Sequence, residues 1–530
     1  MPHVVRDFEM RLVKAYIHSQ TAMKKILVSL LTRGKLHEEK VLRQEYFKTE
    51  SRTISEKRVF DTTKEVKIVV VNPTPLRRLE VVDLHVSSEL FSLSSPLRSK
   101  VETQIQNSFV LEGQSFKTAS FEIDIPAFGI EVLTMSPDER RKTDNKSNGA
   151  SEGNNETFVL ENMHFKAEFS KETGMIKRVI SNDGKVTELV TEFHSFYTTK
   201  GGAYIMDADS GDVPFSTHQR YVTITTGPLT SEVKVSSRGF VYRVRLYNTT
   251  GISGHGIHVS LELNMPALGM KNKDVVMLVR TNIESGRGFY TDQNNFNFIG
   301  RKTRKIISEA YYPITGQMVV EDSFKRLNIH TKQPHGVSSL DGAIEIMLDR
   351  HTFRDDGRGL GQGVYDNVKV NSDFIFHIEY KQAPFQPQEN RYTYPTEDAV
   401  LMNEFLQNPL VMYEQVNDIT RLVTKVHPLK SVQFPCDTRI VKFRDIYKDD
   451  LTYNSTSLVL HRRSLHCGFV KKNSQCQITN KVLTVKDLFP KLKVKLTETS
   501  LSMVFEKRQM SLYDDIRPPR DELRTFKINL

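Results

Sequence analysis

EVKIVVVNP (residues 65–73) and RLEVVDLHV (78–86) are two β-branched runs separated by a turn that contains proline. Runs of this composition are typical of β-strands. SFVLEGQ (108–114) and SFEIDIPAFGIEVLTM (120–135) follow, again with polar turns between them. These four runs predict a small antiparallel β-sandwich over residues 57–135.

The segment before this sandwich, residues 1–56, has a helical pattern instead. Residues 4–33 predict one long amphipathic helix, and Gly34 stands where a helix C-cap would lie. Its apolar side chains repeat close to every 3.6 residues: Val5, Phe8, Leu12, Tyr16, Met23, Ile26, Leu27 and Leu30. Because so wide an apolar stripe needs partner helices, we interpret residues 1–56 as the remnant of a helical bundle.

The chain after residue 135 divides into three parts. Residues 136–156 are polar, rich in Asn, Gly and Ser, and lack large apolar side chains, which predicts a flexible linker. Residues 157–395 contain strand-like runs spaced by about ten residues, which predicts a large β-sandwich. Residues 396–530 begin with EDAVLMNEFLQNP, which fits a short helix or a loop, and continue as scattered strands, so we expect a C-terminal β region. The fold class is therefore mainly β with a helical segment at the N-terminus.

Composition excludes several classes of protein. A chain of 530 residues is too long for one compact core, and no apolar run approaches the roughly 20 residues of a membrane span. The net charge of +10 is spread among 64 acidic residues without a basic cluster, so we expect a solvated basic surface and no nucleic-acid partner. The N-terminus lacks a signal sequence, so taken literally the chain begins in the cytosol.

One feature points instead to the secretory pathway. Four Asn-x-Ser/Thr sequons are candidate N-glycosylation sites, at Asn145, Asn155, Asn248 and Asn454. The three cysteines are too few for a disulfide scaffold. Cys467 and Cys476 could close a small hairpin, and the alternative is that these thiols are buried or idle.

The densest polar stretch is HTFRDDGRGLGQGVYDN (351–367). Its glycines lack the strand and helix context of a dinucleotide loop, and no P-loop lysine follows, so we expect them to permit positive φ angles or a close backbone approach. Asp355 and Asp356 fit metal ligands, an acid/base pair or simple turn chemistry, and Arg358 could clamp hydroxyls or a carboxylate. This loop is the best candidate site in the sequence.

Several stretches, taken in order, resemble the C-terminal half of glycoside hydrolase family 38 α-mannosidases, and the Golgi α-mannosidase II class in particular. They are GGAYIMDADSG (201–211), GFYTDQNNFNFIGRK (288–302), the region 311–367 that ends in GLGQGVYDN, and LVLHRRSLHCG (458–468). The resemblance implies a large galactose-mutarotase-like β super-sandwich. It also implies a retaining exo-α-mannosidase that trims α1,3- and α1,6-linked mannose from N-glycans in the Golgi lumen.

The resemblance also implies which groups this chain lacks. In the family, the zinc ligands, the nucleophile and the general acid belong to an N-terminal α/β barrel, and no matching residue occurs here. We therefore expect no catalytic residue and no metal ligand in this chain, and we expect it to be inactive alone. The barrel domain and mannose-containing N-glycans are the expected partners, with a homodimer left open.

Two positions are carried over from the family as sugar-contacting residues. Tyr204 in GGAY matches a tyrosine whose hydroxyl reaches the bound mannose, and Arg358 in DDGRG matches an arginine beside the same pocket. Asp355 and Asp356 are expected to support the loop. The resemblance also implies a disulfide between Cys467 and Cys476. The alternative function is a stand-alone carbohydrate-binding module that never had a barrel.

Overall fold

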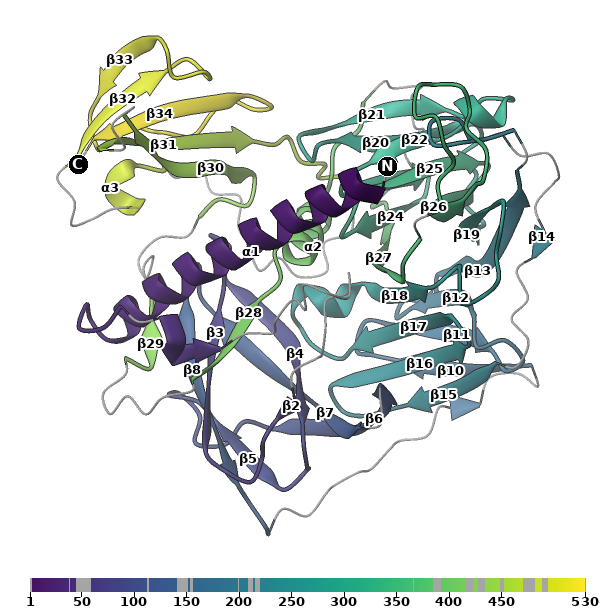
Figure 1. Cartoon of the computed structure of the whole chain (residues 1–530), viewed down its shortest axis with the longest axis horizontal. Coiled ribbons are helices and arrows are strands. Elements are labelled where there is room, and N and C mark those ends of the chain that lie inside the picture. Colours follow the sequence, from purple (N-terminus) through teal and green to yellow (C-terminus); the bar gives the residue numbers. More distant parts are fainter. Residues whose placement is uncertain are drawn as a thin grey trace.

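A computed structural model of the chain describes residues 2–37, 39–43, 59–111, 114–140, 151–152, 156–198, 200–207, 213–214, 220–365, 367–384, 392–415, 423–427, 434–448, 452–469, 482–488 and 494–529. These residues form five β-sheets (Figure 1), so the mainly β fold class is confirmed. The α-helices are α1 (Pro2–Leu31), α2 (Glu397–Gln407) and α3 (Val485–Leu488), and 3-10 turns lie at Glu39–Val41, Ile252–His255 and Ile307–Glu309.

Two sheets form the small sandwich. The first has the order β1 (Leu42–Arg43), β28 (Val411–Gln415), β3 (Val66–Val71), β8 (Ile130–Pro137) and β29 (Lys425–Val426), with β5 (Phe91–Ser94) also paired to β8. The second has the order β2 (Val59–Phe60), β4 (Arg78–Val86), β7 (Gln114–Ile125) and β6 (Thr103–Leu111). Strand β28 inserts between β1 and β3, although it lies far along the chain in the stretch expected to form a separate C-terminal region.

The uninterrupted apolar run of residues 68–71 follows from burial of β3 on both faces. Ile68 and Val70 belong to the core between the two small sheets. Val69 and Val71 face the other way and pack with Leu27, Val28 and Leu31 of α1. A strand covered on both faces has no solvent side, so its sequence does not alternate.

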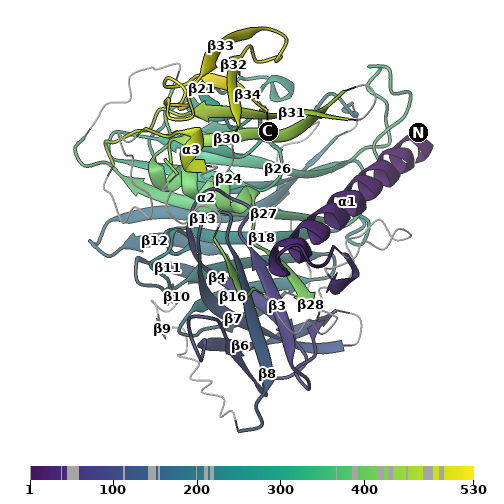
Figure 2. The ribbon, with the colours of Figure 1, turned by 90° about the vertical axis from the view of Figure 1, so that its left-hand side faces the viewer.

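Helix α1 confirms the helix predicted over residues 4–33, but it is buried only at its C-terminal end. Leu27, Val28 and Leu31 are buried, whereas Phe8 is 61% and Leu12 70% exposed. Figure 2 shows the N-terminal end of α1 projecting away from the sheets. The apolar stripe read from the sequence is therefore mostly uncovered in the described part of the chain.

The large sandwich also consists of two sheets. One has the order β22 (Tyr312–Ile314), β25 (His335–Leu340), β26 (Ala343–His351), β19 (Lys273–Thr281), β13 (Val186–Tyr197), β12 (Ile176–Ser181), β11 (Phe165–Ser170), β10 (Thr157–Glu161) and β9 (Ser151–Glu152), with β14 (Val213–Pro214) paired to β13. The other has the order β15 (Tyr221–Thr225), β16 (Thr230–Ser237), β17 (Phe240–Tyr247), β18 (Ile257–Leu263), β27 (Val370–Tyr380), β24 (Lys325–Thr331), β23 (Gln317–Glu321), β20 (Gly288–Gln293) and β21 (Asn297–Lys302).

The two large sheets bury one continuous core between them, to which alternate residues of each strand contribute. In β17 these are Phe240, Tyr242, Val244 and Leu246. The residues between them include Arg245, which forms ion pairs with Glu232 of β16 and with Asp83 of β4 in the small sandwich. The outer face of this sheet is therefore polar where the small sandwich docks.

A fifth sheet lies near the C-terminus, with the order β30 (Thr438–Tyr447), β31 (Tyr453–Arg462), β34 (Leu523–Asn529), β32 (Lys495–Thr499) and β33 (Glu506–Met510). Helix α2 lies where this sheet and the two sandwiches meet (Figure 1). One apolar cluster joins α2 residues Leu401, Met402 and Phe405 to Leu76 of the small sandwich, Ile375 of the large sandwich and Cys436.

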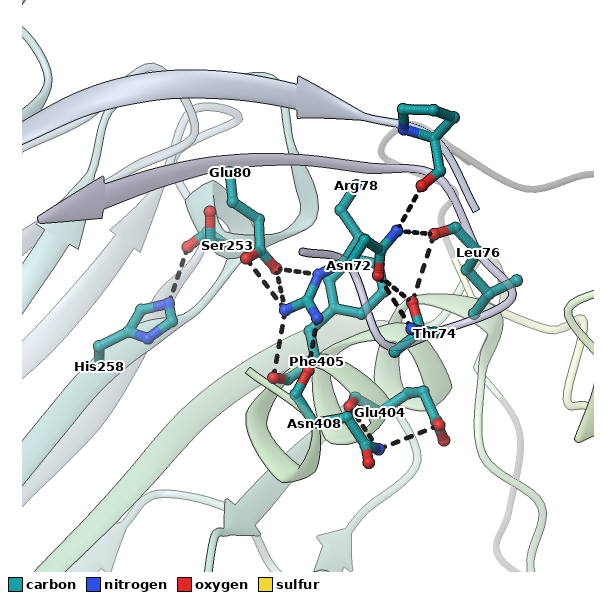
Figure 3. A network of polar contacts seen from close by, with 11 residues as sticks. Asn72, Thr74, Leu76, Arg78, Glu80, Ser253, His258, Glu404, Phe405 and Asn408 are labelled. Atoms are coloured by element: carbon teal, nitrogen blue, oxygen red, sulfur yellow. Dashed lines mark hydrogen bonds and ion pairs between the residues drawn. The ribbon is translucent and has the colours of Figure 1, made fainter. Parts of the chain in front are cut away.

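A buried ion pair fixes the C-terminal end of α2 to the small sandwich (Figure 3). Arg78 is 1% exposed, and its guanidinium donates to Glu80 at 2.8 Å, to the Phe405 carbonyl at 3.3 Å and to the Asn408 carbonyl. Burial raises the pKa of Glu80, and Arg78 opposes this rise. The last carbonyls of a helix lack partners within the helix and carry partial negative charge, so a buried cation satisfies them.

No helix in the described part of the chain has the length and apolar character that a bilayer crossing requires.

Candidate functional site

The GGAY loop and the DDGRG loop leave the large sandwich at the same end. β13 ends at Tyr197, which pairs with Lys273 at the start of β19. Lys273 also pairs with His351 at the end of β26. The segments that follow β13 and β26 therefore emerge on either side of β19, which brings residues 200–207 and 352–365 together although about 150 positions separate them.

Asp356 joins these two loops directly. Its Oδ2 accepts hydrogen bonds from the backbone N–H groups of Tyr204 at 2.6 Å and Ile205 at 2.9 Å. Its Oδ1 accepts from the backbone N–H of Arg358 at 3.3 Å. Desolvation raises the pKa of Asp356, but the three N–H donors outweigh it and the pKa is lowered. A charged carboxylate is therefore the form that holds the loops together.

The backbones of the two loops approach too closely for a side chain at Gly202. A Cβ atom there would lie 2.6 Å from the backbone nitrogen of Asp356. In the DDGRG loop, Gly357, Gly359 and Gly361 have φ angles of 68°, 98° and 73°. The expectation that glycines serve positive φ angles and close backbone approach is confirmed for these positions.

Arg350 holds the GGAY loop from the side of the sheet. Its Nη2 donates to the Ile205 carbonyl at 3.0 Å, and its Nε donates to Asp274 at 2.7 Å. Asp274 is fully buried, which raises its pKa, and Arg350 opposes that rise. Ile205 is thus fixed at both its N–H, by Asp356, and its carbonyl, by Arg350.

The base of the DDGRG loop is closed by its own residues. Thr352 and Val364 form an isolated β-bridge, with a backbone hydrogen bond of 2.7 Å. Asn367 donates through Nδ2 to the Arg350 carbonyl at 2.7 Å and to both oxygens of Asp349 at 3.0 Å. Nothing in the sequence alone marks Arg350 or Asn367 as anchors, because each acts through a partner set by strand register.

The two residues predicted to contact sugar are both exposed on this pair of loops. Tyr204 is 65% exposed, and Arg358 is exposed as well. Phe353 and Tyr365 are about half exposed, with ring centroids 6.1 Å apart, and they flank the same loop. The surface therefore presents a phenol, a guanidinium and two aromatic rings, a combination suited to hydrogen bonding and packing against a polyhydroxylated ligand.

The two aspartates differ in their surroundings. Both oxygens of Asp356 already accept backbone hydrogen bonds, whereas Asp355 is exposed. Within the described ranges, no three His, Cys, Asp or Glu side chains are arranged to hold a metal ion. These residues do not fit a zinc site.

The expectation of a disulfide between Cys467 and Cys476 is wrong, as the state of Cys467 shows. Cys467 is a free, exposed thiol. Cys436, which is buried at the α2 junction, is instead disulfide-bonded. The family resemblance implied the pairing, but Cys467 lies in the loop after β31, where its thiol faces solvent. Cys476 lies outside the described residues.

Two of the four sequons fall within the described residues. Asn248 accepts a hydrogen bond from the Met163 N–H at 2.9 Å and donates to the Pro228 carbonyl at 3.0 Å. Asn454 is exposed on β31. Asn145 and Asn155 lie outside the described residues, and glycosylation at any of the four stays a prediction.

Comparison with known proteins matches the region that holds both loops. The sequence model of the family described as "Glycosyl hydrolases family 38 C-terminal domain" matches residues 160–358, a range that includes Tyr204 and Arg358. Residues 160–358 are therefore similar to that domain. The resemblance to the C-terminal half of the family 38 α-mannosidases, predicted from the sequence, is confirmed.

Similarity to known proteins extends beyond the family 38 domain. Alpha-mannosidase 2 of Homo sapiens is 28% identical over 561 residues, which cover 99% of this chain and 49% of that protein. Alpha-mannosidase 2x of Mus musculus is 29% identical over 511 residues, which cover 87% of this chain and 44% of that protein. The chain thus spans about half the length of these relatives.

A solved structure supports the fold. The crystal structure of a family 38 protein from Enterococcus faecalis superimposes with a TM-score of 0.57 at 12% identity, over 88% of this chain and 59% of that chain.

Proposed function

We propose that this chain is the C-terminal portion of a Golgi-type family 38 α-mannosidase that removes α1,3- and α1,6-linked mannose from N-glycans. Its part is to supply one wall of the pocket for the terminal mannose. The observation that carries this proposal is the bridge through Asp356, which brings the Tyr204 loop and the Arg358 loop to one exposed surface.

Each exposed side chain has a role that its chemistry supports. The Tyr204 hydroxyl donates to or accepts from a sugar hydroxyl, and the Arg358 guanidinium donates to hydroxyl oxygens from its planar fork. Asp356 and Arg350 position Tyr204, because Asp356 accepts from the backbone N–H groups of Tyr204 and Ile205 and Arg350 donates to the Ile205 carbonyl. These residues bind and orient the sugar, and they transfer no proton.

The hydrolytic groups belong, in this proposal, to an N-terminal α/β barrel domain that also binds zinc. Retaining glycosidases need a nucleophilic carboxylate and a general acid about 5 Å apart, on either side of the glycosidic bond. The chain spans about half of its relatives, which leaves that domain to the other half. We expect residence in the Golgi lumen.

Weak mannose binding by the chain alone tests the sugar-contacting role. Titration with methyl α-mannoside, followed by saturation-transfer NMR, should give a dissociation constant on the order of millimolar, because half of the pocket is absent. Tyr204→Phe and Arg358→Ala should weaken binding, whereas Tyr392→Phe, another exposed tyrosine outside the two loops, should leave it unchanged. Equal binding by all four proteins would contradict the proposal.

An assay of hydrolysis by the chain alone tests whether the hydrolytic groups lie in a separate domain. We expect no turnover of p-nitrophenyl α-mannoside, with or without added zinc. Turnover comparable to that of a full-length family enzyme would contradict the proposal that the hydrolytic groups lie in a separate barrel domain.

A further inference from the structure

A second hollow lies at the opposite end of the large sandwich from the Tyr204 and Arg358 loops. It has a volume of about 1870 Å³ and is lined by the β12–β13 turn at Lys185, the segment after β19, the segment after β21 and the β23–β24 turn. The strands between the two ends are 9 to 12 residues long in β19 and β13. At about 3.3 Å per residue, the Lys185 end of these strands lies roughly 30 to 40 Å from their Tyr197 end. The segment after β21 runs back toward the GGAY loop, where Ile307 packs against the cluster that contains Met206.

Positive charge is concentrated in this groove. Eight Lys and Arg side chains line it, against four Asp and Glu side chains. Two of these four carboxylates are already engaged. Glu321 pairs with Arg326 and Lys381, and Asp322 accepts backbone hydrogen bonds from Phe324 and Lys325.

Four of the cations have no carboxylate partner among the described residues: Arg287, Arg301, Arg304 and Lys305. Arg287 donates to the Thr303 carbonyl at 3.2 Å, and Arg301 donates to Thr291 at 2.9 Å, so both are held by neutral groups that leave their charge uncompensated. Arg304 and Lys305 are exposed. A groove with uncompensated charge of one sign attracts a ligand of the opposite sign.

The shape of the groove favours a carbohydrate. Small residues such as Ser285, Gly286 and Gly288 line it, and a Cβ at Gly286 would meet nothing within 4 Å. Phe324 and Ile306 are 63% and 58% exposed and give the groove apolar surfaces against which the C–H face of a sugar ring can pack. A volume of this size holds several sugar units rather than a single ion.

We propose that this groove binds a polyanionic oligosaccharide that carries sulfate or phosphate esters, at a site separate from the Tyr204 and Arg358 loops. Arginine forks bind tetrahedral oxyanions in two-point geometry, and lysine contributes a point charge. The proposal does not depend on the mannosidase function, because none of its residues lies on the Tyr204 or Arg358 loops.

Fluorescence anisotropy with labelled oligosaccharides tests the proposal on the whole chain. The probes are a heparin-derived sulfated hexasaccharide and a phosphorylated mannopentaose, which distinguish the two esters. The comparison ligands are the desulfated hexasaccharide, a poly-glutamate peptide and phosphatidylserine vesicles. At least one esterified sugar should bind more tightly than every comparison ligand, and its affinity should fall as salt rises.

A double variant, Arg304→Ala with Lys305→Ala, should weaken that binding by about tenfold. It should also reduce, by about two, the steepness of the plot of log affinity against log salt concentration. Lys442→Ala with Arg444→Ala removes an equal charge from exposed positions on β30 and should change affinity by no more than about twofold. Circular dichroism should show that both variants stay folded. Binding unchanged in the Arg304 and Lys305 variant would overturn the proposal, as would stronger binding of the peptide or the vesicles than of both esterified sugars.

Discussion

At the scale of single residues, Asp356 matters more than its exposed neighbour Asp355. Asp356 accepts three backbone hydrogen bonds from two loops, whereas Asp355 is exposed on the same turn. Asp356 therefore supports the proposed sugar-contacting loops, and a pair of matched substitutions can separate its role from that of Asp355.

Asp356→Ala should release the GGAY loop. Without the carboxylate, the N–H groups of Tyr204 and Ile205 lose their acceptor, so a peptide covering residues 200–207 should exchange its amide hydrogens faster. Hydrogen–deuterium exchange with mass spectrometry measures this directly. Asp355→Ala is the control and should leave exchange unchanged, and an equal rate in both variants would refute the role given to Asp356.

Sequence reasoning found part of this site. It selected Tyr204, Arg358 and the glycines from their motifs, and the positive φ angles at Gly357, Gly359 and Gly361 bear out the reading of the glycines. It could not find the contact between Asp356 and Tyr204, because that contact depends on the register of β13, β19 and β26. The cysteine pairing, which the family resemblance implied, fails because Cys467 is a free, exposed thiol.

At the scale of secondary-structure elements, Arg78 joins β4 to the C-terminal end of α2 (Figure 3). The neighbouring Arg77 also pairs with a carboxylate, Asp124, but at the surface. The two positions therefore offer a comparison of one interaction type in two environments.

Arg78→Met should lower the free energy of unfolding by about 3–5 kcal/mol, because it leaves Glu80 charged and buried without a partner. Arg77→Met should change it by less than about 1 kcal/mol, because an exposed ion pair contributes little. Denaturant unfolding followed by circular dichroism gives both values. Adding Glu80→Gln to Arg78→Met should restore part of the loss, and similar values for Arg77→Met and Arg78→Met would count against the account.

Most elements were predictable, but some of their partners were not. The helices at residues 4–33 and within 397–409 and the strands of the first sandwich follow from period and composition. Residues 68–71 do not alternate because α1 covers the second face of β3. The return of β28 to pair with β3 is a long-range contact that no local pattern encodes.

At the scale of the whole molecule, several histidines are buried and neutral. Burial lowers the pKa of His258 to about 4, with a nearby Arg245 adding to the effect, and burial together with Arg463 lowers that of His461 to about 4. In the unfolded chain each would titrate near 6.5. Between pH 6.5 and pH 4 the unfolded state therefore binds more protons than the folded state, so stability falls as pH falls.

We expect the free energy of unfolding to drop by about 2–4 kcal/mol from pH 7 to pH 5. The chain has no tryptophan, so far-UV circular dichroism should follow urea unfolding at each pH. His258→Gln keeps a donor for the Ser253 carbonyl and should reduce the loss by up to half. His37→Gln, at an exposed position, should not. Stability that is flat over this range would contradict the assignment of buried neutral histidines.

We propose that this chain forms the sugar-contacting side of a mannose pocket whose hydrolytic residues lie in another domain. A chimera joins the N-terminal half of human alpha-mannosidase 2, which this chain does not match, to residues 1–530. The direct measurement is its kcat/KM for a mannose-terminated N-glycan, with and without Arg358→Ala. The account predicts hydrolysis by the chimera and a loss of about tenfold or more in the variant. A folded chimera that hydrolyses the glycan equally well with Arg358 replaced would contradict it.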